Sequence, residues 1–465
     1  MPGARKIAVI DIGKTNAKVA LVDLVSLKEV AVHQTPNRVI DAQPYPHYDI
    51  EALWSFIIAS LAALQSEHGI GAITVTTHGA SAVLLDAGGE LAAPVLDYEH
   101  DGPDQLAAEY DNVRPGFEET GSPRLPMGLN LGAQLYWQFA SFPEIRERTA
   151  KILTYPQYWA YRLSGVVSTE TTSLGCHTDL WNPNGKTFSS LVDKCGWAEL
   201  MAPVHKAVDR LGMITNEIAV LTGLSPETPV ICGIHDSNAS LYPYLASRQP
   251  PFSVVSTGTW VICMAIGGSN VRLDPSRDTL INVNAFGDPV PSARFMGGRE
   301  FEVAMRGRAA ECSADDMLAV VAKRAMLLPA VESRSGPFQG CRHRWTVAEE
   351  DLMPGERHAV LSFYLAMMTA TCLDIIGADG AAIIEGPFAS NDAYRRMLAA
   401  ATGRSVIPAA GGTGTSAGSA LLCEPRQFGP LQSEIHPVDA PEGFGAYAKE
   451  WQETAAGQVQ PGRRK

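Results

Sequence analysis

Two apolar strands joined by a tight polar turn open the chain. Residues 7–12 read Ile-Ala-Val-Ile-Asp-Ile, the turn follows at Gly13 to Thr15, and β-type residues resume directly over 16–23. In a Walker loop the lysine ends a Gly-x-x-x-x-Gly-Lys-Ser/Thr run, and a helix follows it. The sequence therefore favours a hairpin whose turn approaches a phosphate group, although an ordinary β-hairpin has the same local pattern.

The same order of elements returns near the middle of the chain. Residues 252–256 predict a strand, 257–259 a turn and 260–266 a second strand. The segment just before them, Ser-Arg-Gln-Pro-Pro over 247–251, is the best linker in the sequence. A strand, a turn and a strand at the start of each half indicate a divergent duplication.

Strands and helices alternate after both hairpins. We expect helices over 49–68 and 356–377, with strands at 72–77 and 381–385. This pattern predicts α/β units, each a mixed sheet covered by helices. Because 465 residues exceed one hydrophobic core, we divide the chain into an N-terminal lobe, a C-terminal lobe and a frayed tail, over 1–247, 248–442 and 443–465.

The composition and charge limit the classes of protein to which this chain can belong. With 46% hydrophobic and 19% charged residues, the chain is typical of a soluble globular protein. A net charge of -13 argues against a nucleic acid partner. The N-terminus lacks the apolar core of a signal peptide, and we expect no later segment of membrane-spanning length, so the predicted location is cytoplasmic with no membrane partner. The eight cysteines are singly spaced, and most of them are expected to be buried thiols.

Several polar residues follow directly after predicted strands. Turns containing Gly13, Gly258 and Gly386 each come after a β-rich run and are candidates to meet one nucleotide. Asp236 comes just after the predicted strand at 229–234 and just before a predicted helix, which is where open α/β sheets tend to build binding sites. The alternative role for this aspartate is to cap the N-terminus of that helix. His78, after the strand at 72–77, could bond a hydroxyl group or be structural.

The opening hairpin also carries an acidic residue, Asp11. This carboxylate could lie near a metal ion, and its alternative role is to bond its own turn.

Together these segments resemble the FGGY carbohydrate kinases from Ile7 to about Leu422, and among the branches of that family the rhamnulokinases are the most similar. Residues 11–18 are similar to the first phosphate motif of the family, and 256–260 to the second. Residues 77–86 resemble its sugar-side strand pair. Residues 233–240 resemble the run that holds the catalytic base.

Two segments depart from the family pattern. Residues 155–165 resemble an Asp-Tyr-x-x-x-Arg-Leu-Thr-Gly segment, with Gln157 where aspartate is usual. Residues 386–391 occupy the place of the adenosine motif, where Glu385 and Pro387 replace two glycines. The run at 412–418 is similar to the turn and helix that close the nucleotide site.

The resemblance implies an α/β, two-lobed actin-like fold, that is, a duplicated ribonuclease H-like ATPase fold with the active site in the interlobe cleft. It also implies ATP and Mg²⁺ as cofactors. The expected catalytic base is Asp236. Expected nucleotide contacts are Gly13, Lys14, Thr15, Asn16, Lys18, Thr257, Gly258, Thr259, Gly386, Phe388, Asn391, Gly412 and Thr413; expected sugar contacts are His78, Gly79, His235 and Asp236; expected metal ligands are Asp11 and Asp236.

The activity implied is ATP-dependent phosphorylation of a terminal hydroxyl group of a small ketose, of the L-rhamnulose or L-fuculose type. Alternatives are a pentulose kinase acting on xylulose or ribulose, a non-catalytic sugar-binding regulator, and a nucleotide hydrolase. A carboxylate such as Asp236 would accept the proton that the sugar hydroxyl loses as it attacks the γ-phosphoryl group. A homodimer is a candidate assembly, because it is the commonest one among soluble proteins.

Overall fold

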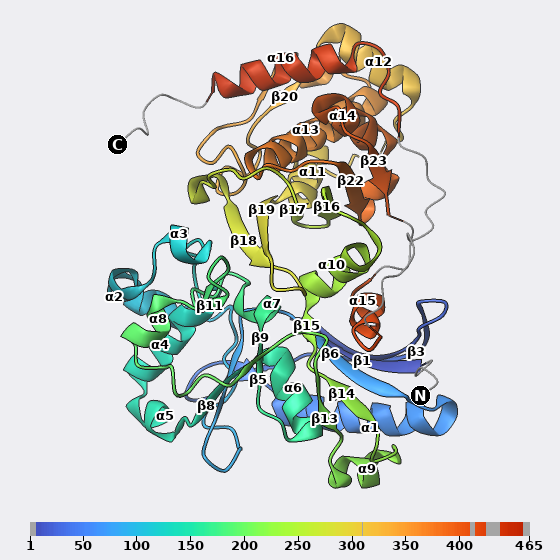
Figure 1. The fold of residues 1–465 in the computed structure, drawn as a ribbon. Coiled ribbons are helices and arrows are strands. Elements are labelled where there is room, and N and C mark those ends of the chain that lie inside the picture. Colours follow the sequence, from blue (N-terminus) through green and yellow to red (C-terminus); the bar gives the residue numbers. More distant parts are fainter. Residues whose placement is uncertain (1–5, 309, 410–413, 425–437, 459–465) are drawn as a thin grey trace. The chain divides into compact units, whose positions relative to one another are not determined.

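The computed structural model describes residues 6–308, 310–409, 414–424 and 438–458. The chain divides into two units (Figure 1). The N-terminal unit comprises Met1–Ser247, Ile281–Pro289 and Gly411–Leu431, and the C-terminal unit comprises Arg248–Leu280, Val290–Ala410 and Gln432–Lys465. Each unit is built of helices and sheet, as predicted, but two late segments of the chain return to the N-terminal unit.

The N-terminal unit is built on a sheet in the order β13-β14-β6-β1-β2-β3, with β15 also pairing with β6. The strands of the N-terminal unit, in this sheet and in smaller two-stranded sheets, are β1 (Lys6–Ile12), β2 (Asn16–Asp23), β3 (Lys28–Pro36), β4 (Val39–Ile40), β5 (His47–Tyr48), β6 (Ala72–Thr77), β7 (Ala82–Leu85), β8 (Lys151–Thr154), β9 (Thr169–Glu170), β10 (Trp181–Asn182), β11 (Thr187–Phe188), β12 (Val204–His205), β13 (Arg210–Met213), β14 (Pro229–Ile231) and β15 (Ile234–His235). β1 runs antiparallel to β2 and parallel to β6. The opening hairpin is therefore present as predicted.

Helices of the N-terminal unit pack on this sheet and on the long connections between its strands. They are α1 (Ile50–His68), α2 (Ala107–Val113), α3 (Phe117–Thr120), α4 (Leu131–Ser141), α5 (Pro143–Arg148), α6 (Tyr155–Ser164), α7 (Thr171–Leu174), α8 (Ser190–Lys194), α9 (Asn216–Thr222), α10 (Asp236–Ser247) and α15 (Thr415–Leu421). α1 begins after Asp49, whose carboxylate accepts a hydrogen bond from the backbone of Ala52. Leu53, Ile57 and Leu61 follow at helical spacing and are buried, so this face packs into the core.

α15 joins the N-terminal unit from far along the sequence. Its Gly418 lies against α10 so closely that an added Cβ would be 1.8 Å from the carbonyl oxygen of Ala239. Ala420 of α15 lies in a buried cluster with Ile7 and Val9 of β1. A glycine at 418 therefore allows the two helices to touch, and the helix covers one face of the sheet.

The C-terminal unit repeats the strand arrangement, in a sheet of the order β18-β19-β17-β16-β22-β23. β16 runs antiparallel to β17 and parallel to β22, as β1 does with β2 and β6. The elements are β16 (Phe252–Thr257), β17 (Val261–Ile266), β18 (Thr279–Val283), β19 (Pro289–Phe295), α11 (Gly297–Met305), α12 (Ala314–Lys323), β20 (Leu327–Leu328), β21 (Arg344–Trp345), α13 (Pro354–Ile375), β22 (Ala381–Glu385), α14 (Asp392–Thr402), β23 (Val406–Pro408) and α16 (Phe444–Ala456). The repeated sequence pattern thus gives a repeated fold element.

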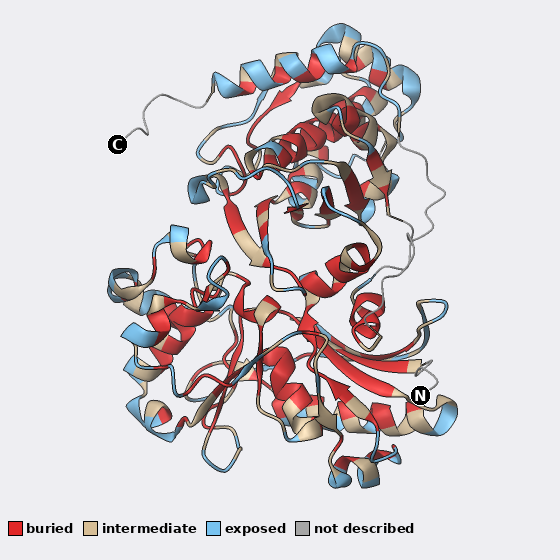
Figure 2. Cartoon of the chain, viewed as in Figure 1, coloured by how far each residue is buried: buried red, intermediate tan, exposed pale blue. Residues whose placement is uncertain are grey.

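α13 corrects the expectation that no later segment is long and apolar enough to cross a membrane. It has 22 residues, and its composition satisfies that test. However, 78% of its most apolar stretch is buried, and its buried residues belong to the core cluster of the C-terminal unit, so it is a core helix there (Figure 2).

The expectation of a frayed tail from residue 443 is wrong over α16. Phe444 and Trp451 are buried, and the Trp451 indole donates a hydrogen bond of 2.7 Å to the carbonyl oxygen of Leu327. Aromatic residues at 444, 447 and 451 recur with helical spacing, which is the signal that the sequence interpretation missed.

Candidate active site

Three parallel strands of the N-terminal unit end at one edge of its sheet. Ile12 of β1 is paired with Thr77 of β6, and Thr77 is paired with His235 of β15. The turns that follow these strands therefore lie side by side, which is where open α/β sheets bind ligands. This register brings together three candidate segments that are far apart in sequence: the hairpin turn, His78–Gly79 and His235–Asp236.

Asp236 is the first residue of α10, and its two carboxylate oxygens have different environments. Oδ1 accepts hydrogen bonds from the backbone N of Ser237 at 2.6 Å and from its hydroxyl at 3.2 Å, and lies 3.2 Å from Nε2 of His235. Within the described residues, Oδ2 has no hydrogen-bond partner. The side chain is 35% exposed. Asp236 thus bonds the first turn of its helix with one oxygen and keeps the other available.

His235 is buried between Asp236 and a cysteine that the sequence interpretation left among inert core thiols. Its Nε2 lies 3.7 Å from Sγ of Cys176. Burial opposes protonation of His235, but the adjacent Cys176 and Asp236 outweigh it and raise the pKa of the imidazole. His235 is therefore suited to donate a hydrogen bond to Asp236 and hold that carboxylate in place.

Gly79 makes room for this histidine. A Cβ added at Gly79 would lie 2.8 Å from Nε2 of His235, closer than real Cβ contacts. The glycine predicted as a sugar contact thus has a packing reason of its own.

Asp11 lies in a charged group on the hairpin. Its Oδ2 is 3.5 Å from the Lys18 ammonium, and Lys18 is also 3.0 Å from Glu29. Burial raises the pKa of Asp11 to about 6, against the opposing charge of Lys18, and the carboxylate of Asp236 adds to the rise. A buried carboxylate that is repelled by a second carboxylate is a favourable place for a cation.

The raised pKa of Asp11 predicts a pH-dependent cost to folding. The ordinary aspartate pKa is about 4, so between about pH 4 and 6 the folded state binds more protons than the unfolded state, and stability falls as the pH rises. We expect Asp11→Asn to stabilise the metal-free protein at pH 8 by up to about 3 kcal/mol, and to have little effect near pH 4. Urea unfolding in EDTA at both pH values measures this; an equal change at both would contradict the assignment.

Lys14 lies with a different set of residues from Lys18. Its ammonium is ion-paired with Asp97 and is 3.3 Å from Glu99. It also lies over the rings of Tyr48 and Tyr98, at 5.3 and 4.8 Å from their centroids. The sequence interpretation missed these four neighbours, because nothing local links them to the hairpin.

His78 contacts the same two tyrosine rings, with centroid distances of 5.3 Å to Tyr48 and 5.2 Å to Tyr98. Burial lowers the pKa of His78 to about 4, so the ring is neutral near pH 7. Its Nδ1 is 2.7 Å from the carbonyl oxygen of Gly79 and must be the donor there. The other nitrogen, Nε2, is buried without a partner among the described residues, and in this tautomer it accepts a hydrogen bond.

The hairpin turn itself is braced by its neighbours. The backbone N of Gly13 donates to the carbonyl oxygen of Asn16 at 2.9 Å, and the Asn37 amide donates to the carbonyl oxygen of Gly13 at 2.9 Å. Thr15 and Asn16 remain exposed at its tip. The turn is thus fixed while its tip is open to a ligand.

The C-terminal unit brings together the predicted turns after β16 and β22. The hydroxyl of Thr257 donates to the carbonyl oxygen of Glu385 and accepts a hydrogen bond of 3.1 Å from the backbone N of Phe388. Gly386 has φ +79°, and an added Cβ would be 1.9 Å from the carbonyl oxygen of Thr257. These residues form one compact corner at the carboxyl ends of the two strands.

The other predicted nucleotide contacts differ in their surroundings. Gly258 donates its backbone N–H to the carbonyl oxygen of Trp260 at 2.9 Å, and Thr259 is exposed next to it. Asn391 caps α14, because its side chain accepts from the backbone N of Tyr394 at 2.9 Å. Gly412 and Thr413 lie outside the described residues.

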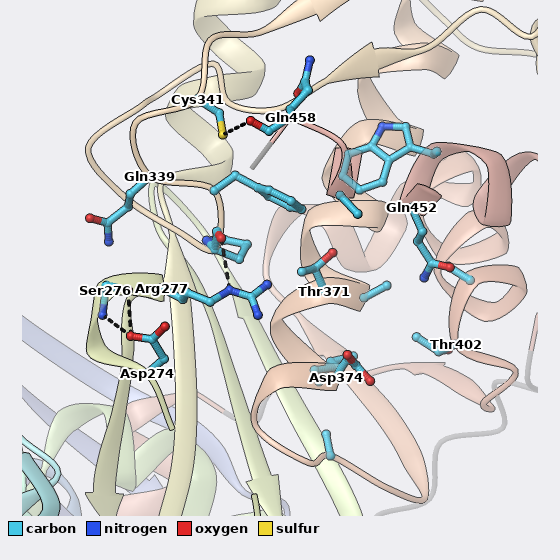
Figure 3. A pocket seen from close by; sticks show the side chains of 18 of the residues that line it. Asp274, Ser276, Arg277, Gln339, Cys341, Thr371, Asp374, Thr402, Gln452 and Gln458 are labelled. Atoms are coloured by element: carbon cyan, nitrogen blue, oxygen red, sulfur yellow. Dashed lines mark hydrogen bonds between the residues drawn. The ribbon is translucent and has the colours of Figure 1, made fainter. Parts of the chain in front are cut away.

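A cavity of about 1500 Å³ lies elsewhere in the C-terminal unit (Figure 3). Arg277, Thr371 and Asp374 line it, together with residues of α16. It also contains Ala378 and Arg404, which precede β22 and β23, whereas Gly386 follows β22. The cavity therefore lies at the amino ends of these strands, the opposite end from the glycine corner, and we do not assign the nucleotide to it.

A magnesium ion fits the residues around Asp11. The described residues contain no group of three or more His, Cys, Asp or Glu side chains placed to hold a metal ion. Mg²⁺ does not need one, because it usually takes one or two protein carboxylates and completes its shell with water and substrate phosphates. Asp11 and Asp236, whose carboxylates interact electrostatically, are the two metal ligands predicted from the sequence.

Comparison with known proteins gives matches over both units. Residues 6–242 match the N-terminal domain of the FGGY family of carbohydrate kinases, and residues 249–431 match the FGGY C-terminal domain. L-fuculokinase from Salmonella typhi is 28% identical over 274 residues, covering 56% of this chain and 57% of that protein. Rhamnulokinase from Mannheimia succiniciproducens is 25% identical over 272 residues, covering 55% and 52%. The chain thus spans little more than half the length of these curated relatives.

A solved structure matches over nearly the whole chain. The crystal structure of a carbohydrate kinase from Novosphingobium aromaticivorans is 35% identical, with a TM-score of 0.89, and the match covers 96% of this chain and 100% of that one. The likeness confirms the predicted actin-like, two-domain α/β fold. With both family domains present along its length, the chain belongs to the FGGY family of carbohydrate kinases.

Proposed function

We propose that the protein transfers the γ-phosphoryl group of ATP to a terminal hydroxyl group of a small ketose. The observation that carries this proposal is Asp236 at the ligand-binding edge of the sheet: Oδ1 accepts two hydrogen bonds from Ser237 and lies 3.2 Å from Nε2 of His235, whereas Oδ2 has no hydrogen-bond partner among the described residues. Binding alone does not require such a base, whereas phosphoryl transfer to an alcohol does.

In this proposal Asp236 is the general base. Oδ2 accepts the proton of the sugar hydroxyl as its oxygen attacks the γ-phosphorus atom, and ADP leaves. His235, with Nε2 3.2 Å from Oδ1, is placed to hold the Asp236 carboxylate. The neutral ring of His78 accepts a hydrogen bond from another hydroxyl group of the sugar through Nε2, the buried atom that has no protein partner among the described residues.

We assign nucleotide contacts to the glycine turn of each unit, each taken by itself. The open tip at Thr15 and Asn16, with Lys18 next to it, supplies donors for phosphate oxygens, and the corner at Thr257 and Gly386 supplies backbone N–H groups. Asp11 and Asp236 are the proposed magnesium ligands. When bound, Mg²⁺ would neutralise the charge on the phosphate oxygens.

We infer a 6-deoxy ketose, L-fuculose or L-rhamnulose, as the acceptor. The support is the likeness to an L-fuculokinase and a rhamnulokinase at 28% and 25% identity. A 6-deoxy ketohexose carries its one primary hydroxyl group at carbon 1, so phosphorylation of a terminal hydroxyl would occur there. Epimers differ by one hydroxyl group, and a site that hydrogen-bonds that group can discriminate strongly.

ADP release measured with a panel of ketoses tests the proposed function. We expect turnover with L-fuculose or L-rhamnulose, and a sugar 1-phosphate as the product by ³¹P NMR. Turnover with xylulose or ribulose alone would identify a pentulose kinase instead. ADP release that is independent of sugar would indicate a hydrolase, and binding of sugar without any ADP release would indicate a regulator.

A further inference from the structure

The segment that leads into Asp236 is held from behind by one buried amide side chain. Gln157, on α6, is fully buried at 0% exposure. Its Nε2 lies 2.9 Å from the carbonyl oxygen of Cys232 and 3.3 Å from that of Gly233. Its Oε1 accepts from the Thr154 hydroxyl at 2.5 Å. The amide nitrogen therefore donates to carbonyl oxygens, and the amide oxygen accepts from a hydroxyl group, so both ends of the side chain have partners of the correct kind.

The backbone at Gly233 has no freedom to move toward β6. Gly233 has φ +86°, and an added Cβ would lie 2.3 Å from the carbonyl oxygen of Val75. The segment is therefore confined by β6 on one side and hydrogen-bonded to Gln157 on α6.

A second hydrogen-bonded chain fixes the far end of the same segment. The backbone N of His235 donates to the Thr172 hydroxyl at 3.1 Å, and that hydroxyl donates to Glu170 at 2.6 Å. Glu170 and Thr172 are both buried. Residues 232–235 are thus held at both ends, immediately before the base.

We propose that Gln157 is a positioning residue for Asp236, acting through the carbonyl groups of Cys232 and Gly233. The inference rests on the proposed role of Asp236 as the base. Gln157 occupies the position where the resembling family segment usually has aspartate, and an ionised aspartate could not donate to two carbonyl groups. Its burial and its contacts give it a structural partner for each amide atom, so it makes no sugar contact.

The sharpest test is Gln157→Glu, which keeps the shape but loses donors when it ionises. The buried carboxyl group can donate one hydrogen bond when protonated and none when charged. We expect kcat relative to the wild type to fall by about 10- to 100-fold as the pH rises from 5.5 to 8.5, with KM for ATP unchanged, because small displacements of a catalytic group are costly. Gln157→Ala should be slow at every pH.

Other titratable groups in or near this segment include His235, Cys176, Cys232, Glu170 and Asp209. Burial raises the pKa of the Cys232 thiol far above its usual range and also raises the pKa of Glu170. These groups are common to the variant and the wild type, so the ratio of their rates isolates the introduced carboxyl group.

Gln138→Glu is the matched control. Gln138 is also buried in a helix of the N-terminal unit, α4, but its amide donates to the Tyr45 hydroxyl at 2.6 Å and does not touch residues 232–235. We expect its rate relative to the wild type to be independent of pH.

Hydrogen exchange provides a readout that does not depend on turnover. In Gln157→Glu the amides of residues 232–237 should lose protection at pH 8.5 relative to the wild type, while those of α1 keep theirs. A wild type without turnover on any sugar would overturn the proposed function but leave this measurement decisive for Gln157. A rate ratio that is flat with pH, protection that does not change, or an equal loss in α1 would each overturn the positioning role.

Discussion

Replacing Asp236 with asparagine is expected to lower kcat by about 10² to 10⁴, while ATP binding stays nearly unchanged. Asparagine can still accept the hydrogen bonds that Ser237 directs at Oδ1, so the first turn of α10 should keep its structure. What the variant loses is the oxygen that accepts the proton. Steady-state kinetics with the preferred ketose, together with calorimetric titration of ATP, separate the two effects.

Asp49→Asn is a suitable control for that variant. Asp49 also sits at the start of a helix in the N-terminal unit and accepts from the backbone of Ala52 at 3.1 Å. Asparagine is an equally good N-cap, so neither stability nor kcat should change appreciably. A kcat for Asp236→Asn as high as that of Asp49→Asn would remove Asp236 from its proposed role.

Among the proposed substitutions, Gly386→Ala is expected to destabilise the protein most. The backbone at Gly386 has φ 79° and ψ -162°, a region that is essentially restricted to glycine. The added methyl group would also lie 1.9 Å from the carbonyl oxygen of Thr257, and backbone atoms cannot yield as a flexible side chain can. Strain and overpacking together should lower the free energy of unfolding of the C-terminal unit by about 2 to 5 kcal/mol.

Gly403→Ala separates strain from overpacking. Gly403 ends α14 with φ +64°, and no atom lies within 4 Å of an added Cβ. This variant should cost only about 1 to 2 kcal/mol, the penalty of a left-handed backbone for an L-residue. Hydrogen exchange of β16 and β22 in increasing urea measures both variants in the same unit. Equal losses would show that contact with Thr257 is not the cause.

The hairpins and the long helices were predictable because their signals are local. Alternating and continuous apolar runs placed the strands at 7–12 and 252–256, and the helix expected over 356–377 is α13, Pro354–Ile375. α16 had an equally local signal in its aromatic spacing, and the interpretation as a frayed tail overlooked it.

The surroundings of the site residues were not predictable in the same way. Lys14 and Asp97 are 83 positions apart, and Cys176 and His235 are 59 apart. No pattern within a strand or helix links such pairs, since only the sheet register and the folding of long connections bring them together. The sequence could therefore name Asp236 and His78 as candidates, but it could not show which nitrogen of His78 or which oxygen of Asp236 would be available.

The return of α15 to the N-terminal unit has a consequence for synthesis on the ribosome. The N-terminal unit cannot complete its fold when residue 247 leaves the ribosome, because the helix that covers β1 is translated some 170 residues later. Until then, Ala239 of α10 and the apolar face of β1 lack their partner. A fragment ending at residue 247 should therefore aggregate, whereas co-expression with fragments that supply both later segments of this unit, residues 281–289 and 411–431, should restore solubility.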